Sequence, residues 1–253
     1  MTEMSPRKRS NCMACDLRQV MVCADVTATE LEDFHTWIDD LAIPPGGTVF
    51  GANSAANGVY CIRSGMVKLT RVSSSGTQRI VRIVKRGDVV GMEALFSEFF
   101  EHAAIAVGEV VACRIPIANF RRMVEANGTL QRRLFEKSQR ALHEAETWLS
   151  ELAGGTAHAR ERLARLLLRM REGNTNRIHR FNLEDIGGML GITIETASRV
   201  LSDFNRQGLI TKQTAGKEKR FYSADIAALE KIAKGDPAEQ IAHMAHRTVR
   251  FGT

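Results

Sequence analysis

The feature that most constrains the fold of this chain is a change of hydrophobic pattern near Pro116. Between Thr48 and Pro116, short β-branched runs are separated by glycines, as in Gly58–Gly65 and Met66–Val72. After Pro116, apolar residues recur at the three- and four-residue spacing of helices. Short, regularly spaced strands with turn signals favour a small antiparallel barrel or roll. The pattern therefore predicts an α+β protein in which a β-rich domain precedes a helical one.

Length and composition are those of an ordinary globular protein. The chain has 253 residues, of which 44% are hydrophobic and 25% charged, enough for one large core or two smaller ones. No run approaches the ~18 apolar residues of a membrane span, and the basic N-terminus is not followed by the apolar stretch of a signal peptide. We therefore expect a cytoplasmic protein without a membrane partner, whose cysteines stay reduced.

The charge of the chain is distributed unevenly. Residues 1–154 carry 18 Lys/Arg and 18 Asp/Glu, whereas residues 155–253 carry 17 and 11, so the net charge of +6 lies in the C-terminal part. A basic domain beside a neutral one favours binding to the phosphates of nucleic acid. Many basic domains bind no nucleic acid, so this asymmetry supports other signals and does not replace them.

Beyond Pro116 the sequence predicts a short helix over Ile117–Ala126 and a long one over Gly128–Ala153, ended by Gly154 and Gly155. Apolar and small residues recur along the long helix at alternating three- and four-residue steps; they are Phe135, Ser138, Leu142, Ala145, Leu149 and Leu152. Such a stripe is either a coiled-coil seam between two copies or part of an ordinary core. Its small residues make any dimer built on it marginal.

A second motif predicts a helix-turn-helix. We expect a first helix over Leu183–Leu190, a sharp turn at Gly191, and a second helix from Thr193 to about Gln207, with Thr193 as its N-cap. Two short strands of a wing follow. The basic residues of the wing either contact the DNA backbone or are solvated charges, and the sequence does not decide between these; they are Lys212, Lys217, Lys219 and Arg220.

The second helix carries the candidate DNA-reading residues. Glu195, Ser198 and Arg199 lie at i, i+3 and i+4, so they share one face. In a major groove, Arg199 can donate two hydrogen bonds to guanine, Glu195 can accept from cytosine, and Ser198 can meet a base edge. Thr193 and Thr196 are better placed for phosphates. The alternative is a solvated salt bridge between Glu195 and Arg199.

The N-terminal segment carries three closely spaced cysteines. Cys12, Cys15 and Cys23 form a C-x2-C-x7-C trio in residues 1–25, which we expect to be a loop, and Cys113 follows much later. Grouped thiolates suit a soft metal centre, above all iron–sulfur; a zinc site, thiol–disulfide sensing or unconnected thiols are the alternatives. Cys61, in the middle of a predicted strand, is interpreted as a core residue. A short helix is expected over about Ala28–Leu41.

With these motifs in order, the chain resembles the CRP/FNR superfamily of bacterial transcription factors, and within it the FNR-type oxygen sensors. The resemblance covers Cys12 to about Leu229 and rests on the four cysteines together with Gly87–Leu95, Glu161–Ala164 and Glu195–Arg199. It implies an N-terminal β-roll sensory domain of the cyclic-nucleotide-binding kind, a long dimerisation helix and a C-terminal winged helix-turn-helix. The corresponding boundaries are 1–126 for the cysteine arm and roll, 127–155 for the helix, 156–235 for the DNA-binding domain and 236–253 for a tail.

The resemblance also implies a function. FNR-type members bind one [4Fe–4S] cluster per subunit in the absence of oxygen, here through Cys12, Cys15, Cys23 and Cys113. They then form homodimers, bind TTGAT-N4-ATCAA sites in double-stranded DNA, and activate transcription through RNA polymerase as anaerobic global regulators. Oxygen degrades the cluster and separates the dimer. Ser73–Thr77 aligns with a loop that contacts RNA polymerase in the family, and Ile194 stands where CRP-like members carry an Arg.

Two departures and two rival functions remain. Seven residues separate Cys15 from Cys23 where the best-known members have five. A CRP-like regulator gated by a nucleotide or other small molecule is one rival; Glu93 is present, but the phosphate-binding Arg expected some ten residues later is missing, so we interpret Glu93 as a structural carboxylate. The other rival is an enzyme with a Cys12–Cys15 dithiol, which no further catalytic motif supports. We therefore expect a regulator and not an enzyme.

Overall fold

The computed structural model describes residues 8–9, 12, 15–18, 24, 37–72, 78–150 and 158–235. The chain divides into two compact units, residues 1–145 and 146–253. Among the described residues, no helix is both long and apolar enough to cross a membrane. Each unit is described by itself below.

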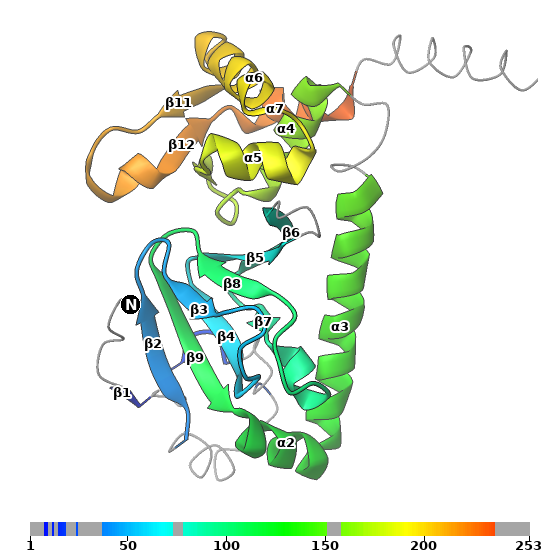
Figure 1. The fold of residues 1–253 in the computed structure, drawn as a ribbon. Coiled ribbons are helices and arrows are strands. Elements are labelled where there is room, and N and C mark those ends of the chain that lie inside the picture. The colour runs from blue at the N-terminus through cyan, green and yellow to red at the C-terminus, as the bar shows by residue number, and fades with distance from the viewer. Residues whose placement is uncertain are drawn as a thin grey trace, which may run out of the picture. The chain divides into compact units, whose positions relative to one another are not determined.

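The first unit is a roll of two antiparallel sheets (Figure 1). In the described residues one sheet has five strands in the order β1-β2-β9-β4-β7, and the other has four in the order β3-β8-β5-β6. The strands are β1 (Lys8–Arg9), β2 (Asp39–Ile43), β3 (Thr48–Phe50), β4 (Gly58–Ser64), β5 (Met66–Val72), β6 (Gln78–Lys85), β7 (Val89–Val90), β8 (Ala103–Ala106) and β9 (Val110–Pro116).

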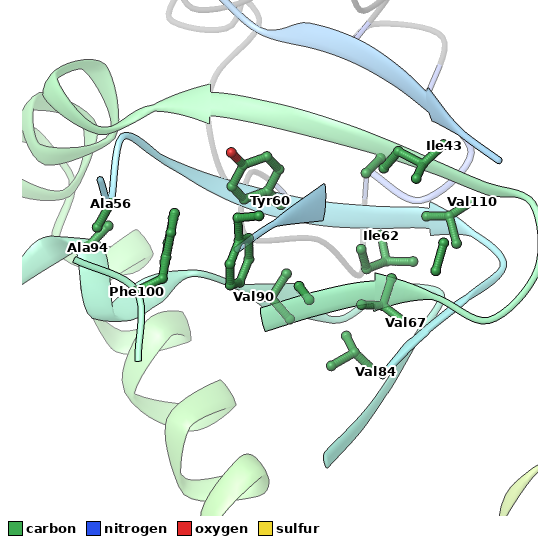
Figure 2. Close-up of a cluster of buried hydrophobic side chains, with 14 residues drawn as sticks. Ile43, Ala56, Tyr60, Ile62, Val67, Val84, Val90, Ala94, Phe100 and Val110 are labelled. Carbon is green, nitrogen blue, oxygen red and sulfur yellow. The ribbon is translucent and has the colours of Figure 1, made fainter. Parts of the chain in front are cut away.

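Two core clusters hold the first unit together. The first lies between the two sheets, where β-branched and aromatic side chains from both sheets meet (Figure 2). Phe50 and Phe100 stack there with ring centroids 3.9 Å apart. The sharp turn from β4 to β5 depends on Gly65, whose φ is +83° and where a Cβ would lie 2.2 Å from the Glu109 carbonyl oxygen. Such an approach excludes any other residue at this turn.

The second cluster joins the outer face of the five-stranded sheet to the helices that follow it. After a short 3-10 turn, η1 (Met92–Leu95), and the strands β8 and β9, the chain forms α2 (Ile117–Ala126) and α3 (Gly128–Trp148). Phe120 and Met123 of α2 are buried in this cluster, together with Leu130 and Leu134 of α3. The Asn127 side chain accepts from the Leu130 backbone N–H at 2.9 Å and so caps the start of α3.

The second unit is a winged helix-turn-helix. Its helices are α4 (Ala159–Arg169), α5 (Leu183–Leu190), α6 (Ile194–Arg206) and α7 (Ile226–Lys234). A three-stranded sheet in the order β10-β12-β11 forms the wing from Arg177–His179, Phe221–Ala224 and Ile210–Lys212, with a 3-10 turn, η3 (Gly216–Arg220), before β12. The buried face of α4, with Leu163, Leu166 and Leu167, supplies much of the core.

Most of the predicted elements are present. The helices over residues 117–126 and 183–190 have the predicted bounds, the recognition helix differs by one residue at each end, and the long helix begins at Gly128 and is described as helix to Trp148. The helix predicted over Ala28–Leu41 is wrong at its C-terminal end, because Asp39, Asp40 and Leu41 belong to β2, which pairs with β9. Its earlier residues, apart from Trp37 and Ile38, lie outside the described part of the chain.

Candidate cysteine centre and DNA-binding helix

Four cysteines lie in the described part of the chain, and all four belong to one core cluster. Cys12, Cys61 and Cys113 are buried in it, and the half-buried Cys15 packs against it. The same cluster contains the two buried leucines near the start of α3. Three of the four cysteines expected to bind the metal cluster therefore belong to the core cluster that contains the start of that helix; Cys23 lies outside the described residues.

Cys61 is a core residue that also lies opposite another cysteine, Cys113. It is buried, as predicted, with 2% of its surface exposed. In the antiparallel register of β4 and β9 it lies directly opposite Cys113, and directly opposed residues of two such strands project to the same face of the sheet. Sequence reasoning missed this pairing because no local signal gives the register of two strands so far apart. Cys61 therefore lies beside the candidate cysteine centre and faces one of its members, Cys113.

Charged side chains surround the centre. Nη1 of Arg63 donates to both carboxylate oxygens of Asp40 at 3.0 and 3.1 Å, and Cys113 Sγ donates to Asp40 Oδ1 at 3.7 Å. Burial lowers the pKa of Arg63, but the Cys113 sulfur and the Asp40 carboxylate more than offset this, so the pKa is raised. Asp16, beside Cys15, pairs with Arg86, which donates to the Arg63 carbonyl at 3.2 Å. The sulfur atoms thus lie next to a guanidinium that stays charged.

The donor chemistry of the centre suits iron–sulfur. Soft thiolates in an apolar cluster are the ligands that such clusters take in proteins. Within residues 8–9, 12, 15–18, 24, 37–72, 78–150 and 158–235, however, no three His, Cys, Asp or Glu side chains stand close enough to hold a metal ion. Cys23, the fourth ligand of the expected set, is not among those residues. The described thiols thus fit the group in type and neighbourhood, without forming a complete site by themselves.

The face of α3 turned away from the roll is apolar and exposed. Phe135 and Leu142 of α3 and Leu149, which directly follows its last residue, recur every seven residues, and 66%, 53% and 66% of their surfaces are exposed. Ser138 is exposed and Ala145 half-buried between them, while Leu152 lies outside the described residues. Large exposed hydrophobic side chains in a row mark an interaction surface. The stripe is therefore not core of the single chain, which was one of the two interpretations of its pattern.

The helix-turn-helix is built by local contacts. The Asn182 side chain accepts from the Asp185 backbone N–H at 2.6 Å and caps α5, and Thr193 accepts from the Thr196 N–H at 3.2 Å and caps α6. Gly191 adopts a left-handed conformation, with φ 61°, at the turn. A Cβ on Gly187 would lie 2.9 Å from the Ile192 carbonyl oxygen, so a glycine there lets α5 approach the turn. These contacts position the N-terminus of α6.

The candidate reading residues face solvent. Glu195 and Arg199 are exposed, and Ser198 and Thr196 are half-buried, while Ala197, Leu201 and Phe204 turn to the core. The pKa of Glu195 is lowered by hydrogen bonds from its own backbone N–H and from the Thr193 hydroxyl. Among the described residues, Arg199 has no hydrogen bond or ion pair. The alternative of a Glu195–Arg199 salt bridge is therefore not formed, and the guanidinium is available to a partner.

The wing carries two arginines, Arg177 and Arg180, that sequence reasoning did not single out, besides Arg220, which it did. Arg177 lies 4.0 Å from the ring centroid of Phe221, Arg180 lies 5.2 Å from that of Tyr222, and Arg220 lies 5.7 Å from that of Phe221. Stacking on aromatic rings helps to hold a guanidinium in place. The Arg177 guanidinium also pairs with Glu172 at 3.1 Å, and that of Arg180 donates to the Lys219 carbonyl at 2.7 Å. Arg177 begins the three-residue strand β10 and Arg180 follows it, and so short a strand has no periodicity from which sequence reasoning could have found them.

The roll offers little room for a nucleotide phosphate. The recess between η1 and α3, lined by Arg82, Asp88, Lys137 and others, has a volume of about 10 Å³, no more than a single water molecule needs. Burial there lowers the pKa of Lys137, whose Nζ donates to the Gly87 carbonyl at 3.0 Å. A larger cavity of about 330 Å³ is lined by β2, β3 and aromatic rings. Its arginine, Arg114, is paired with Asp39 at 3.2 Å.

Comparison with known domain families gives two matches. Residues 41–127 match the family described as "Cyclic nucleotide-binding domain", and residues 161–232 match the "Crp-like helix-turn-helix domain". The two matched segments correspond to the roll with α2 and to the winged helix-turn-helix.

Comparison with individual proteins gives relatives over most of the chain. It is 31% identical over 206 residues to the nitrogen fixation regulation protein FixK of Bradyrhizobium diazoefficiens, covering 79% of this chain and 85% of that protein. It is 26% identical to the fumarate and nitrate reduction regulatory protein of Escherichia coli, covering 79% and 82%. Among solved structures, FixK2 from Bradyrhizobium japonicum is similar with a TM-score of 0.66 at 25% identity, covering 77% of this chain and 96% of that one.

Proposed function

Because this chain belongs to the CRP/FNR family of transcription regulators, whose members are not enzymes, we propose that it is an oxygen-responsive regulator. It acts as a homodimer on palindromic DNA of the TTGAT-N4-ATCAA type, and its DNA affinity depends on one [4Fe–4S] cluster per subunit. The observation that carries the proposal is the meeting of Cys12, Cys15 and Cys113 with the buried start of α3 in one core cluster.

DNA recognition is assigned to α6. Arg199 donates to the O6 and N7 atoms of a guanine, Glu195 accepts from a cytosine amino group, and Ser198 meets a base edge. The lowered pKa of Glu195 keeps its carboxylate ionised and able to accept. Thr193 and Thr196, at the N-terminus of α6, contact phosphates. The stacked arginines of the wing add phosphate contacts that carry no sequence information.

Dimerisation is assigned to the exposed face of α3. Two copies of the stripe formed by Phe135, Leu142 and Leu149 bury each other's apolar side chains in a parallel pair. A palindromic site requires this two-fold pairing, with recognition helices about 34 Å apart. The small residues at positions 138 and 145 limit the buried area, so the dimer is weak and its population responds to modest free-energy changes.

The cysteines connect sensing to this dimer. Cys12, Cys15, Cys23 and Cys113 are the proposed ligands, and a [4Fe–4S] cluster bound by them supplies an oxygen-sensitive cross-link between the N-terminal arm and β9. Cys113 and the buried leucines of α3 belong to the same core cluster. A change in the packing of the thiols therefore alters the packing of α3, the proposed dimerisation helix. Ser73–Thr77, which lie outside the described residues, are the proposed RNA polymerase contact.

The direct test is anaerobic purification followed by controlled admission of air. We expect iron and sulfide in equal amounts, a visible charge-transfer absorbance that air bleaches, and a dimer that separates as the colour is lost, measured by analytical ultracentrifugation. Operator binding in a gel shift should follow the dimer. A colourless, iron-free protein prepared without air that binds its operator as a dimer contradicts the proposal.

A regulator gated by a small molecule is the second candidate, and the match to a cyclic nucleotide-binding domain favours it. In the described part of the roll, the recess beside α3 is too small for a phosphate group, and the larger cavity presents the Asp39 carboxylate. Titration calorimetry with cyclic AMP separates the two candidates. We expect no heat of binding; micromolar binding that strengthens operator affinity favours the ligand-gated regulator instead.

A further inference from the structure

Cys61 has no role in the proposed function, although it lies beside the candidate cysteine centre. Its direct partner across the sheet is Cys113, one of the proposed ligands. Both side chains are buried in the same cluster, with 2% and 9% of their surfaces exposed. Neither cysteine is in a disulfide in this structure. Two thiols that face each other from adjacent strands are a candidate redox pair.

The strand pairing fixes the geometry of the two thiols. The Ile62 N–H donates to Asp88, and the Ile62 carbonyl accepts from Gly87, so the backbone groups of Ile62 point away from β9. Because these groups alternate along a strand, those of Cys61 point toward β9. Pro116, which has no N–H, lies opposite Gly58, and this agrees with the same alternation. Cys61 and Cys113 are therefore a hydrogen-bonded pair, with Cα atoms about 5.5 Å apart.

This separation permits a disulfide. Bridged cysteines have Cα atoms about 4.4–6.8 Å apart and Cβ atoms about 3.5–4.5 Å apart. Opposed Cβ atoms lie about 4.5–5.5 Å apart, so the strands must approach by up to about 1 Å for the bond to form. Such a bond is strained, and strained disulfides are the readily reduced ones. The geometry suits a reversible bond better than a permanent one.

The surroundings indicate which sulfur reacts first. Cys113 has 9% of its surface exposed and Cys61 has 2%, so an oxidant that enters the cluster reaches the Cys113 sulfur first. The turn at residues 15–18 contributes Asp16 to an exposed ion pair with Arg86, whose side chains are 69% and 53% exposed, and exposed ion pairs add little to stability. Opening this contact, a local event, admits an oxidant as small as hydrogen peroxide.

We infer that Cys61 and Cys113 form a thiol switch that closes into a disulfide under peroxide and withdraws Cys113 from metal binding. The Cys113 thiolate attacks one peroxide oxygen, the O–O bond breaks, and a sulfenic acid and hydroxide form. The sulfur of Cys61 then attacks that of Cys113, the S–O bond breaks, and the hydroxide leaves as water with the Cys61 proton. Two thiols and one hydrogen peroxide give one disulfide and two waters, with two electrons passing from sulfur to oxygen.

The consequence for regulation rests on the proposed function. While the disulfide persists, Cys113 cannot ligate iron, so the return of low oxygen alone does not restore a regulator. A thiol reductant must first open the bond. The chain would then respond to peroxide as well as to oxygen, with a delayed recovery after oxidative stress.

The test of the disulfide uses metal-free protein, so its outcome does not depend on the metal cluster. The folded wild-type chain is treated with hydrogen peroxide, its remaining thiols are alkylated, and a non-reduced digest is analysed by mass spectrometry. We expect the loss of two thiols, recovered by dithiothreitol, and one peptide pair linked through Cys61 and Cys113. The C12A/C15A variant, which keeps both strand cysteines, should give the same linked pair. Linkage of Cys12 to Cys15, linkage through Cys23, or irreversible oxidation without a linked pair overturns the inference.

The consequence has its own readout. Peroxide-treated wild-type protein should take up iron and sulfide only after dithiothreitol has reduced the disulfide. In the Cys61→Ala variant Cys113 stops at the sulfenic acid, so uptake should be at least tenfold faster than in the wild type when the only reductant is arsenite, which reduces sulfenic acids and leaves disulfides intact. Equal rates in the two proteins contradict the switch. If neither protein takes up iron even when fully reduced, the proposed cluster is wrong while the disulfide result stands.

Discussion

In the helix-turn-helix unit, the residues that are expected to read DNA lie within seven consecutive positions, 193 to 199, and most of them face solvent. The core cluster that contains the cysteine centre, by contrast, gathers mostly buried residues from positions 12 to 134 and includes residues of the paired strands β4 and β9. One region is local and presents its side chains to a partner. The other is assembled by the fold and hides them.

Because of this difference, a substitution in the reading surface of α6 can change DNA binding without changing stability, whereas a substitution in the cysteine centre changes both. A substitution at an exposed reading residue removes contacts to DNA while changing the free energy of unfolding by about 0.5 kcal/mol or less. A substitution in the cysteine centre changes the packing between the five-stranded sheet and α3 as well. Tests of the cysteine centre therefore need a control that is equally buried and equally placed.

The largest expected effect is that of Cys113→Ala. Loss of one proposed ligand should abolish anaerobic operator binding, so affinity falls to the level of non-specific DNA, about 10³-fold or more. Gel shifts without air measure this. The matched control is Cys61→Ala, because Cys61 has the same burial and lies directly opposite; it should bind normally. If Cys113→Ala keeps the operator affinity of the wild type, or if both variants lose the same amount of affinity, Cys113 acts only as a core residue and not as a ligand.

The next effect is on the exposed face of α3. Leu142→Glu places like charges opposite each other in the dimer, at a cost of about 3 kcal/mol, which corresponds to about 100-fold in the dimer dissociation constant. Because Leu142 is 53% exposed, the thermal stability of the monomer should not change. His143→Glu, next to it but off the stripe, is the control, and sedimentation of the anaerobic protein is the measurement. If Leu142→Glu has the dimer dissociation constant of the wild type, the exposed face of α3 is not the dimer interface.

A smaller effect is expected for Arg199→Ala. The variant should lose about 1–3 kcal/mol of discrimination at one guanine of each half-site and bind random DNA as before. The measurement is a competition gel shift with operators substituted one base pair at a time. Arg206→Ala is the control, since Arg206 is exposed on the same helix but pairs with Asp203 at 2.9 Å. Equal loss on specific and random DNA would assign Arg199 to a phosphate.

The same contrast explains how far the sequence could be interpreted. The helix-turn-helix was predictable almost to the residue because its determinants are local: an N-cap at Thr193, a glycine at the turn, and apolar residues at helical spacing. The end of the helix predicted to Leu41 is wrong because β2 is stabilised by pairing with β9, a partner far along the chain. The opposition of Cys61 to Cys113 and the Asp40–Arg63 pair depend on the same non-local register, which no periodicity reveals.

The smallest expected effect tests how closely the reading surface is tuned by its own cap. The Thr193 hydroxyl accepts from the Thr196 N–H and also bonds to the Glu195 carboxylate, which helps to lower the pKa of Glu195. Thr193→Val should raise that pKa toward its usual value, although the backbone hydrogen bond remains, and should weaken the cap of α6 by about 1 kcal/mol. NMR titration of the Glu195 side chain measures the shift.

Because the wild-type pKa of Glu195 is lowered, its carboxylate stays ionised to lower pH than an ordinary glutamate. Any operator contact that it makes is lost only as the pH falls through that lowered pKa. In Thr193→Val the loss should begin at higher pH, whereas Ser202→Ala, which removes an exposed hydroxyl further along α6, should leave the pKa of Glu195 unchanged. Identical titration curves for wild type and Thr193→Val would show that the backbone alone sets the charge of Glu195.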